Sequence, residues 1–230
     1  MAALELDVPP PARLPAALHR QQLVRLSVDG WMRVLQRPWD DEARACLGLW
    51  AERGLPLVVT RQPPSQGERL ATGLPAPTRF GRRRLAVAVA PCDVLFLDEF
   101  PSATAVTRLL PRTAVATWRA LLAELSANDC AARIYGGYGW QALTRMTYVH
   151  ATSDVDLLLP VASTAQADAV AQVLASTAWD GPRLDGELLL PDGGAVAWRE
   201  WREHREGRVA QVLVKRLRGV ALETPGARLA

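Results

Sequence analysis

Cysteine, lysine and long apolar runs are all scarce in this chain of 230 residues. The three cysteines, Cys46, Cys92 and Cys130, are odd in number and widely spaced, which argues against a disulfide framework and against a Cys-x-x-Cys zinc site. No apolar run approaches the roughly 20 residues of a membrane-spanning helix, and the amino terminus lacks a secretory signal pattern. We therefore expect a cytoplasmic protein without a membrane-embedded part.

The basic residues are almost entirely arginine, because Lys215 is the only lysine among the 27 Lys and Arg residues. Guanidinium groups suit bidentate contacts with phosphate. A formal net charge of +3 is too small to indicate nucleic-acid binding, and it is compatible with a polyphosphate or an acidic protein partner. With 49% hydrophobic and 22% charged residues, the composition is that of an ordinary globular protein.

Apolar periodicity and turn residues predict an α+β protein with two domains. Prolines 9, 10, 11 and 15 predict a mobile leader over residues 1–16. A small amino-terminal α+β domain is expected over 17–105, and a domain of alternating strands and helices over 106–230. The expected strands are 23–28, 55–59, 85–89, 132–135, 154–159, 187–190, 195–199 and 209–215; the expected helices are 40–53, 113–126, one from about 140, and 164–176; a long loop is expected over 63–84.

Two acids at the start of an apolar strand are the most informative feature of the sequence. Asp154 and Asp156 are two residues apart in Ser-Asp-Val-Asp-Leu-Leu-Leu, so on a strand they point to one face while Val155 points to the other. Magnesium prefers oxygen ligands and typically uses one or two carboxylates together with substrate phosphates. The pair therefore predicts a Mg²⁺ site for phosphoryl or nucleotidyl transfer, with both aspartates as catalytic metal ligands.

A pair of glycines precedes these acids. Gly136 and Gly137 follow an expected strand and lead into an expected helix. Without side chains there, backbone N–H groups can approach a phosphate, and the amino terminus of a helix adds partial positive charge. Both glycines are therefore candidate ligands for the phosphates of a donor substrate.

The combination resembles the DNA polymerase β nucleotidyltransferase superfamily, although Gly137 stands where that motif normally has serine. The wider sequence resembles the phosphoribosyl-dephospho-CoA transferase family of malonate decarboxylase over roughly residues 19–215. The segments that carry this second resemblance are 56–59, 73–77, 81–84, 139–144, Tyr148, 153–158, 185–187 and 195–200.

The resemblance implies a nucleotidyltransferase-like carboxy-terminal domain, with a mixed sheet and flanking helices. It also implies transfer of the prosthetic group from 2′-(5-triphosphoribosyl)-3′-dephospho-CoA to a serine of the malonate decarboxylase acyl-carrier subunit, with release of diphosphate. Magnesium on Asp154 and Asp156 would then neutralise charge on the phosphates in the transition state.

A third carboxylate is expected on a neighbouring strand, where it would bind a second metal or take the proton of the attacking serine. Glu187 and Glu200 both lie on expected strands, and the sequence does not choose between them. Asp185 shares a face with Glu187, but its place before Gly186 also suits a turn. Further candidates for binding donor phosphate are the basic residues Arg82, Arg83, Arg84 and Lys215.

Two other functions fit parts of the pattern. One is a nucleotidyltransferase that modifies a different acceptor, such as a small molecule or tRNA. The other is a non-catalytic nucleic-acid or partner-binding module, which would use the arginine surplus without a metal; the small net charge disfavours nucleic acid.

Overall fold

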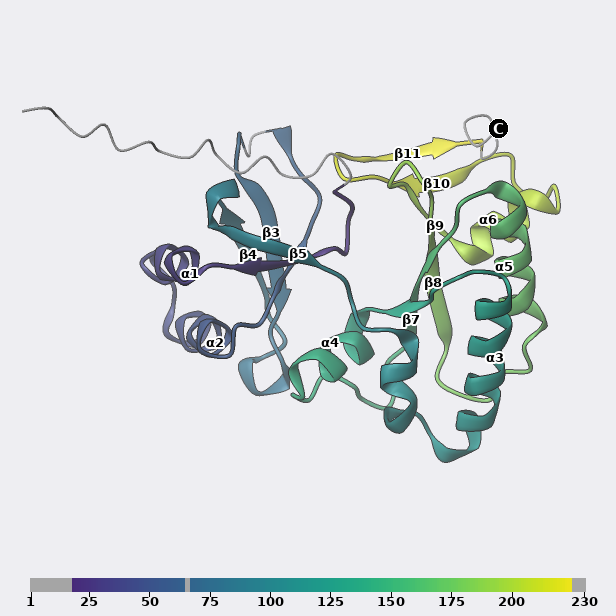
Figure 1. Cartoon of the computed structure of the whole chain (residues 1–230), viewed down its shortest axis with the longest axis horizontal. Helices are drawn as coiled ribbons and strands as arrows, with labels where there is room; N and C mark the ends of the chain where they lie inside the picture. The colour runs from purple at the N-terminus through teal and green to yellow at the C-terminus, as the bar shows by residue number, and fades with distance from the viewer. Residues whose placement is uncertain (1–17, 65–66, 225–230) are drawn as a thin grey trace, which may run out of the picture.

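The computed structural model describes residues 18–64 and 67–224, and it places them in two lobes that each contain one sheet (Figure 1). The predicted leader over 1–16 lies outside the described residues. The α+β class predicted from the sequence is confirmed. Among the described residues, no helix has both the length and the apolar character needed to cross a bilayer.

The first lobe is built on a five-stranded antiparallel sheet in the order β4-β3-β2-β1-β5. Two helices follow β1, and each begins where a side chain caps it: Ser27 accepts from Gly30 N, and Asp40 accepts from Ala43 N. The elements are β1 Leu23–Leu26, α1 Val28–Leu35, α2 Asp41–Glu52, β2 Leu57–Val59, β3 Leu70–Pro75, β4 Arg84–Val89 and β5 Val94–Asp98, with 3₁₀ turns at Thr78–Phe80 and Pro91–Asp93.

The second lobe contains a mixed sheet of six strands in the order β11-β10-β9-β8-β7-β6. Strands β7 and β8 pair in parallel, and helix α5 connects them; the other neighbouring strands of this sheet pair antiparallel. The elements are two 3₁₀ segments at Ala103–Leu109 and Arg112–Ala114, then α3 Val115–Ala127, β6 Arg133–Ile134, α4 Gly136–Thr144, β7 Val155–Pro160, α5 Thr164–Ser176, β8 Leu184–Leu189, β9 Ala195–Ala197, α6 Trp198–Arg205, β10 Val212–Lys215 and β11 Val220–Glu223.

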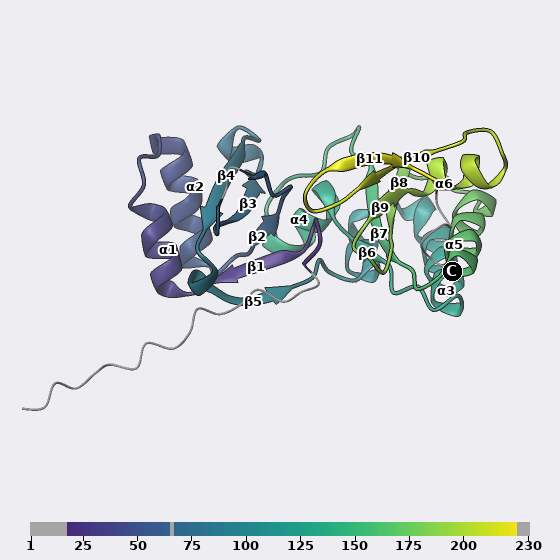
Figure 2. The same cartoon turned by 90° about the horizontal axis from the view of Figure 1, so that it is seen from above.

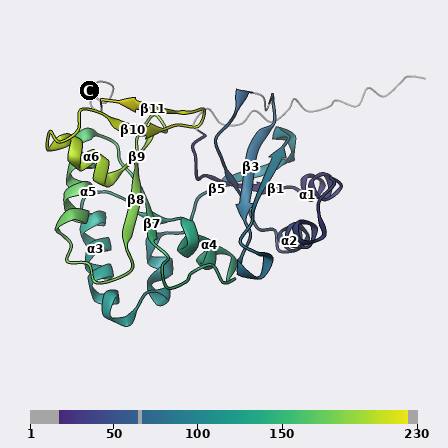
Figure 3. The ribbon, with the colours of Figure 1, turned by 180° about the vertical axis from the view of Figure 1, so that it is seen from behind.

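Helix α4 lies between the two sheets, while the other long helices lie outside them. Helices α1 and α2 cover the far side of the first sheet, and α3 and α5 cover the far side of the second (Figures 2 and 3). Trp140 of α4 is 4% exposed and packs in the core of the first lobe, with its ring centroid 5.4 Å from that of Phe100 and 6.4 Å from that of Trp50. Packing of Trp140 therefore fixes α4 against the first lobe.

Several predicted elements are wrong at identifiable places. Val28 begins α1 instead of extending the first strand, because Ser27 caps a helix there. The expected loop over 63–84 contains β3, whose residues pair with β4 along its whole length. Trp198, Arg199 and Glu200 open helix α6 instead of ending a strand, so the strand position predicted for Glu200 is wrong. The domain boundary near residue 105 stays a prediction.

Candidate active site

A cleft of about 760 Å³ is lined by residues of both lobes. On one side it meets β2, β3 and β4 of the first sheet; on the other it meets the Gly136-Gly137 turn and the two aspartates, Asp154 and Asp156. Val58, Gly73 and Ala86 lie in register across β2, β3 and β4, and all three line the cleft. The sequence-predicted acids and glycines therefore face a space large enough for a substantial ligand.

The backbone at Gly136 brings the start of α4 against Asp156. Gly136 has φ of +60°, and a Cβ built on it would lie 1.9 Å from Asp156 Oδ2. Only glycine fits this combination of a left-handed backbone and a close carboxylate. Tyr135 N donates to Asp156 O at 3.0 Å, which links the start of α4 to β7.

The amino terminus of α4 has backbone donors available for an anion. No side chain caps this helix, and its first backbone hydrogen bond runs from Gly139 N to Tyr135 O. The preceding N–H groups of a helix have no intrahelical partner and suit phosphate oxygens. A Cβ at Gly137 would find Ser153 Oγ at 4.0 Å as its nearest neighbour, so a hydroxyl lies close to the position where the superfamily motif has its serine.

Three carboxylates lie near Asp156. The parallel pairing of β7 and β8 puts Asp156 in register with Asp185. Burial, followed by repulsion from nearby carboxylates in the order Asp185, Asp154 and Glu187, raises the pKa of Asp156 from an ordinary 3.8 to about 7. Arg183 acts in the opposite direction: its Nη2 lies 2.9 Å from Asp154 Oδ2 and 2.8 Å from Asp185 Oδ2. The cluster therefore favours a cation.

The three candidates for a third carboxylate differ sharply in their contacts. Glu187 is 8% exposed and pairs with Lys215, whose Nζ lies 2.6 Å from its Oε1. Glu200 accepts a hydrogen bond from Leu213 N at 3.0 Å. Asp185, which sequence reasoning passed over because Gly186 follows it, has the strand register that faces Asp156. Of the three, Asp185 has the strand position that suits a proton acceptor, and Arg183 Nη2 contacts its Oδ2 at 2.8 Å.

The structure separates the basic candidates. Arg82 and Arg84 line the cleft, whereas Arg83 forms ion pairs with Asp40 at 2.6 Å and Glu42 at 3.4 Å. Lys215 is engaged by Glu187. The cleft has a further arginine that sequence reasoning missed, Arg20, which lies just before β1 and had no motif to mark it.

Two family models together match almost the whole chain. The model described as "Phosphoribosyl-dephospho-CoA transferase MdcG N-terminal domain" matches residues 11–97, and the corresponding C-terminal domain model matches residues 100–225. The chain belongs to the MdcG family. Membership makes the protein a transferase enzyme, as the resemblance in the sequence implied.

Curated relatives of the MdcG family agree with this assignment. A phosphoribosyl-dephospho-CoA transferase of Xanthomonas euvesicatoria pv. vesicatoria is 40% identical over 177 residues, which cover 75% of this chain and 80% of the relative. Its counterpart in Bradyrhizobium diazoefficiens is 33% identical over 204 residues, covering 88% of each chain. No solved structure matches the chain.

The carboxylates fit the magnesium ion that a nucleotidyltransferase-like site implies. Their oxygens are the donors that magnesium prefers, and a divalent cation would offset both the burial of Asp156 and its repulsion by nearby carboxylates, which together raise its pKa. Within the described residues, no group of three or more His, Cys, Asp or Glu residues is placed to hold a metal by itself. Asp154 and Asp156 would therefore hold the ion together with phosphate oxygens of a substrate.

Proposed function

We propose that this MdcG-family enzyme transfers the phosphoribosyl-dephospho-CoA group from 2′-(5-triphosphoribosyl)-3′-dephospho-CoA to a serine of the malonate decarboxylase acyl-carrier subunit, in the cytoplasm, with release of diphosphate. One observation carries the proposal: a single cleft contains the uncapped start of α4, the paired aspartates and three arginines of the opposite lobe. This arrangement has backbone donors, oxygen ligands and guanidinium groups for a polyphosphate chain.

The first sheet supports a long donor. Its cleft-facing wall carries the small residues Val58, Gly73 and Ala86, and a Cβ at Gly73 would lie 2.6 Å from Leu85 O. The cleft beside this sheet offers room for the dephospho-CoA part of the donor, while Arg82 and Arg84 offer contacts for its charged groups.

In the proposed reaction, the serine oxygen of the carrier attacks the phosphorus next to the ribose. The new bond joins serine oxygen to that phosphorus, and the bond from the phosphorus to the diphosphate breaks. Asp154 and Asp156 would hold Mg²⁺, which would neutralise part of the phosphate charge when bound. The N–H groups of Gly136 and Gly137 orient the phosphates, and Asp185 accepts the proton that serine loses.

Transfer to purified apo carrier, followed by intact mass, tests this function. We expect the mass of the carrier to rise by that of the phosphoribosyl-dephospho-CoA group with Mg²⁺ and to stay unchanged with a chelator. Asp154→Ala and Asp156→Ala should abolish the change, whereas Asp180→Ala, which alters an exposed aspartate outside the cleft, should preserve it.

The alternatives give different results in the same assay. A well-folded wild-type protein that leaves the carrier unmodified but consumes another nucleotide donor would indicate a different acceptor. Binding of a partner or nucleic acid that survives Asp154→Ala and weakens steeply with salt would indicate a non-catalytic module.

A further inference from the structure

Arg20 is a cation of the first lobe that reaches the active site of the second. It lines the cleft together with Gly136, Gly137 and Asp156. Its charge acts on the phenol of Tyr135, the residue just before Gly136: burial and nearby carboxylates raise the pKa of Tyr135, and Arg20 opposes them. Arg20 therefore lies near the start of α4, where a phosphate would bind.

Within the part of the chain that the structure describes, no carboxylate forms an ion pair with the Arg20 side chain. Arg83 shows the contrast, because Asp40 and Glu42 already engage its guanidinium. An arginine without a carboxylate partner, in a cleft that also contains Asp154 and Asp156, keeps its hydrogen-bond donors for a ligand.

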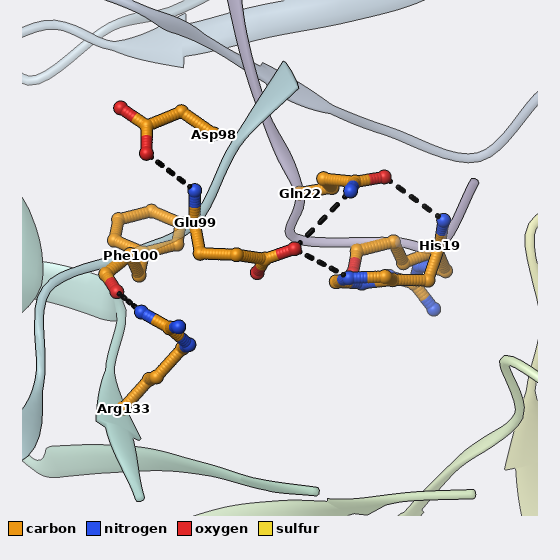
Figure 4. Close-up of polar contacts among 7 residues, drawn as sticks. His19, Gln22, Asp98, Glu99, Phe100 and Arg133 are labelled. Carbon is orange, nitrogen blue, oxygen red and sulfur yellow. Dashed lines mark hydrogen bonds and ion pairs between the residues drawn. The ribbon is translucent and has the colours of Figure 1, made fainter. Parts of the chain in front are cut away.

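Hydrogen bonds hold the main chain at Arg20, and they join the segment before β1 to Glu99, which follows β5. His19 Nδ1 lies 2.6 Å from the carbonyl oxygen of Arg20, and His19 Nε2 lies 3.1 Å from Glu99 Oε1 (Figure 4). Gln22 Nε2 donates to the same Glu99 oxygen at 3.1 Å. A carbonyl and a carboxylate only accept hydrogen bonds, so the ring satisfies both when it carries two protons. Glu99 thus fixes the segment that presents Arg20.

The next residue bends the chain. Gln21 has φ of +68°, a left-handed conformation that is costly for a residue other than glycine. Two backbone bonds hold it there: Gln21 N donates to Val59 O at 3.2 Å, and Val59 N donates to Gln22 O at 2.8 Å. Strain of this kind persists where surrounding contacts over-determine the backbone, and it concentrates at functional sites.

We propose that Arg20 binds the two terminal phosphates of the donor, which leave as diphosphate. The inference rests on the proposed function, because that function supplies a triphosphate donor. Gly136 and Gly137 contact these phosphates from the second lobe through backbone N–H groups, and Arg20 contacts them from the first lobe through its guanidinium fork. The leaving group is thereby held between the lobes.

Calorimetric titration with inorganic diphosphate and Mg²⁺ tests the assignment without a transfer step. We expect Arg20→Ala to weaken diphosphate binding about 10-fold or more, since charge-assisted hydrogen bonds to phosphate are lost. Arg20→Lys, which keeps the charge but not the fork, should fall between Arg20→Ala and wild type. Arg112→Ala, an exposed arginine outside the cleft, is the matched control and should bind as wild type does.

A second ligand separates phosphate recognition from general damage. Dephospho-CoA lacks the triphosphate, so its affinity should change less than about twofold in Arg20→Ala if the cleft is intact. Equal diphosphate affinity of wild type and Arg20→Ala would overturn the assignment. Wild-type protein that binds no diphosphate would overturn the proposed function and this inference with it, whereas diphosphate binding without transfer to the carrier would contradict the proposed acceptor alone.

Discussion

Replacement of Asp156 by asparagine should stabilise the metal-free protein at alkaline pH. The pKa of Asp156 in the fold is about 7 against an ordinary 3.8, because of burial and three neighbouring carboxylates. A folded pKa above the unfolded one means that stability is complete below the unfolded value and is lost as pH rises through the folded value. At pH 8 the fold therefore contains a destabilising charge that Asp156→Asn removes.

The size of this gain follows from the same pKa values. Each tenfold change in an equilibrium constant is worth about 1.36 kcal/mol, so the full difference corresponds to about 4 kcal/mol. Partial access of solvent and relaxation around the carboxylate reduce the electrostatic penalty, and we expect about 2 kcal/mol at pH 8. The gain should shrink steadily towards pH 4, where the wild-type carboxyl is protonated in the folded state and roughly half protonated in the unfolded state.

Urea unfolding with a chelator at pH 4, 6 and 8 measures this difference, with Asp180→Asn as the matched control. Added Mg²⁺ should reduce the difference in unfolding free energy between Asp156→Asn and wild type. A ligand that binds only the folded state stabilises wild type more than a variant that has lost a ligand oxygen. An Asp156→Asn variant that is no more stable than wild type at pH 8 without metal would contradict the raised pKa of Asp156.

Three further predictions concern other contacts of the site. Gly136→Ala puts a Cβ 1.9 Å from Asp156 Oδ2 and should lower the rate of transfer by about 100-fold. Gly137→Ser, whose Cβ has 4.0 Å of clearance, should retain activity in the same kinetic assay. Equal losses in both variants would contradict the close contact between Gly136 and Asp156. Lys215→Ala leaves the buried Glu187 carboxylate without its cation and should lower the free energy of unfolding, measured by urea denaturation, by about 3 kcal/mol. The double variant Lys215→Ala/Glu187→Gln should regain part of this loss. A double variant that is no more stable than Lys215→Ala would argue against the ion pair. Burial lowers the pKa of His19, but its hydrogen bonds to Glu99 and to the Arg20 carbonyl outweigh this and raise it above 6.5. The contribution of His19 to stability is therefore complete below pH 6.5 and lost as pH rises through the folded pKa; Glu99→Gln should flatten this part of the thermal-stability profile, and an identical slope would count against the network.

The local parts of the fold were predictable because local signals determine them. Helix α5 spans Thr164–Ser176, as its apolar spacing and the capping Ser163 indicate. The strand that begins beside Asp154 and Asp156 is likewise present as β7. These elements combine a clear period with a clear start, so little depends on distant contacts.

Contacts between distant segments were not predictable from the same signals. Asp185 gains its importance from the parallel register with Asp156, which no local pattern specifies. Trp198, Arg199 and Glu200 alternate like strand residues over a stretch too short to distinguish a period of 2 from one of 3.6. The Arg82–Arg84 run divides, with Arg83 on Asp40 and its two neighbours in the cleft. Arg82 has φ of +55° in the turn before β4, a left-handed conformation that the arginine run does not indicate.

Diffraction from crystals grown with Mn²⁺ and diphosphate would locate the metal and the phosphates together, since manganese takes oxygen ligands as magnesium does and gives an anomalous signal. We expect a peak between the carboxylates of Asp154 and Asp156, with diphosphate oxygens on the N–H groups of Gly136 and Gly137. A manganese peak and diphosphate bound elsewhere on the chain, with these carboxylates free of metal, would contradict this expectation.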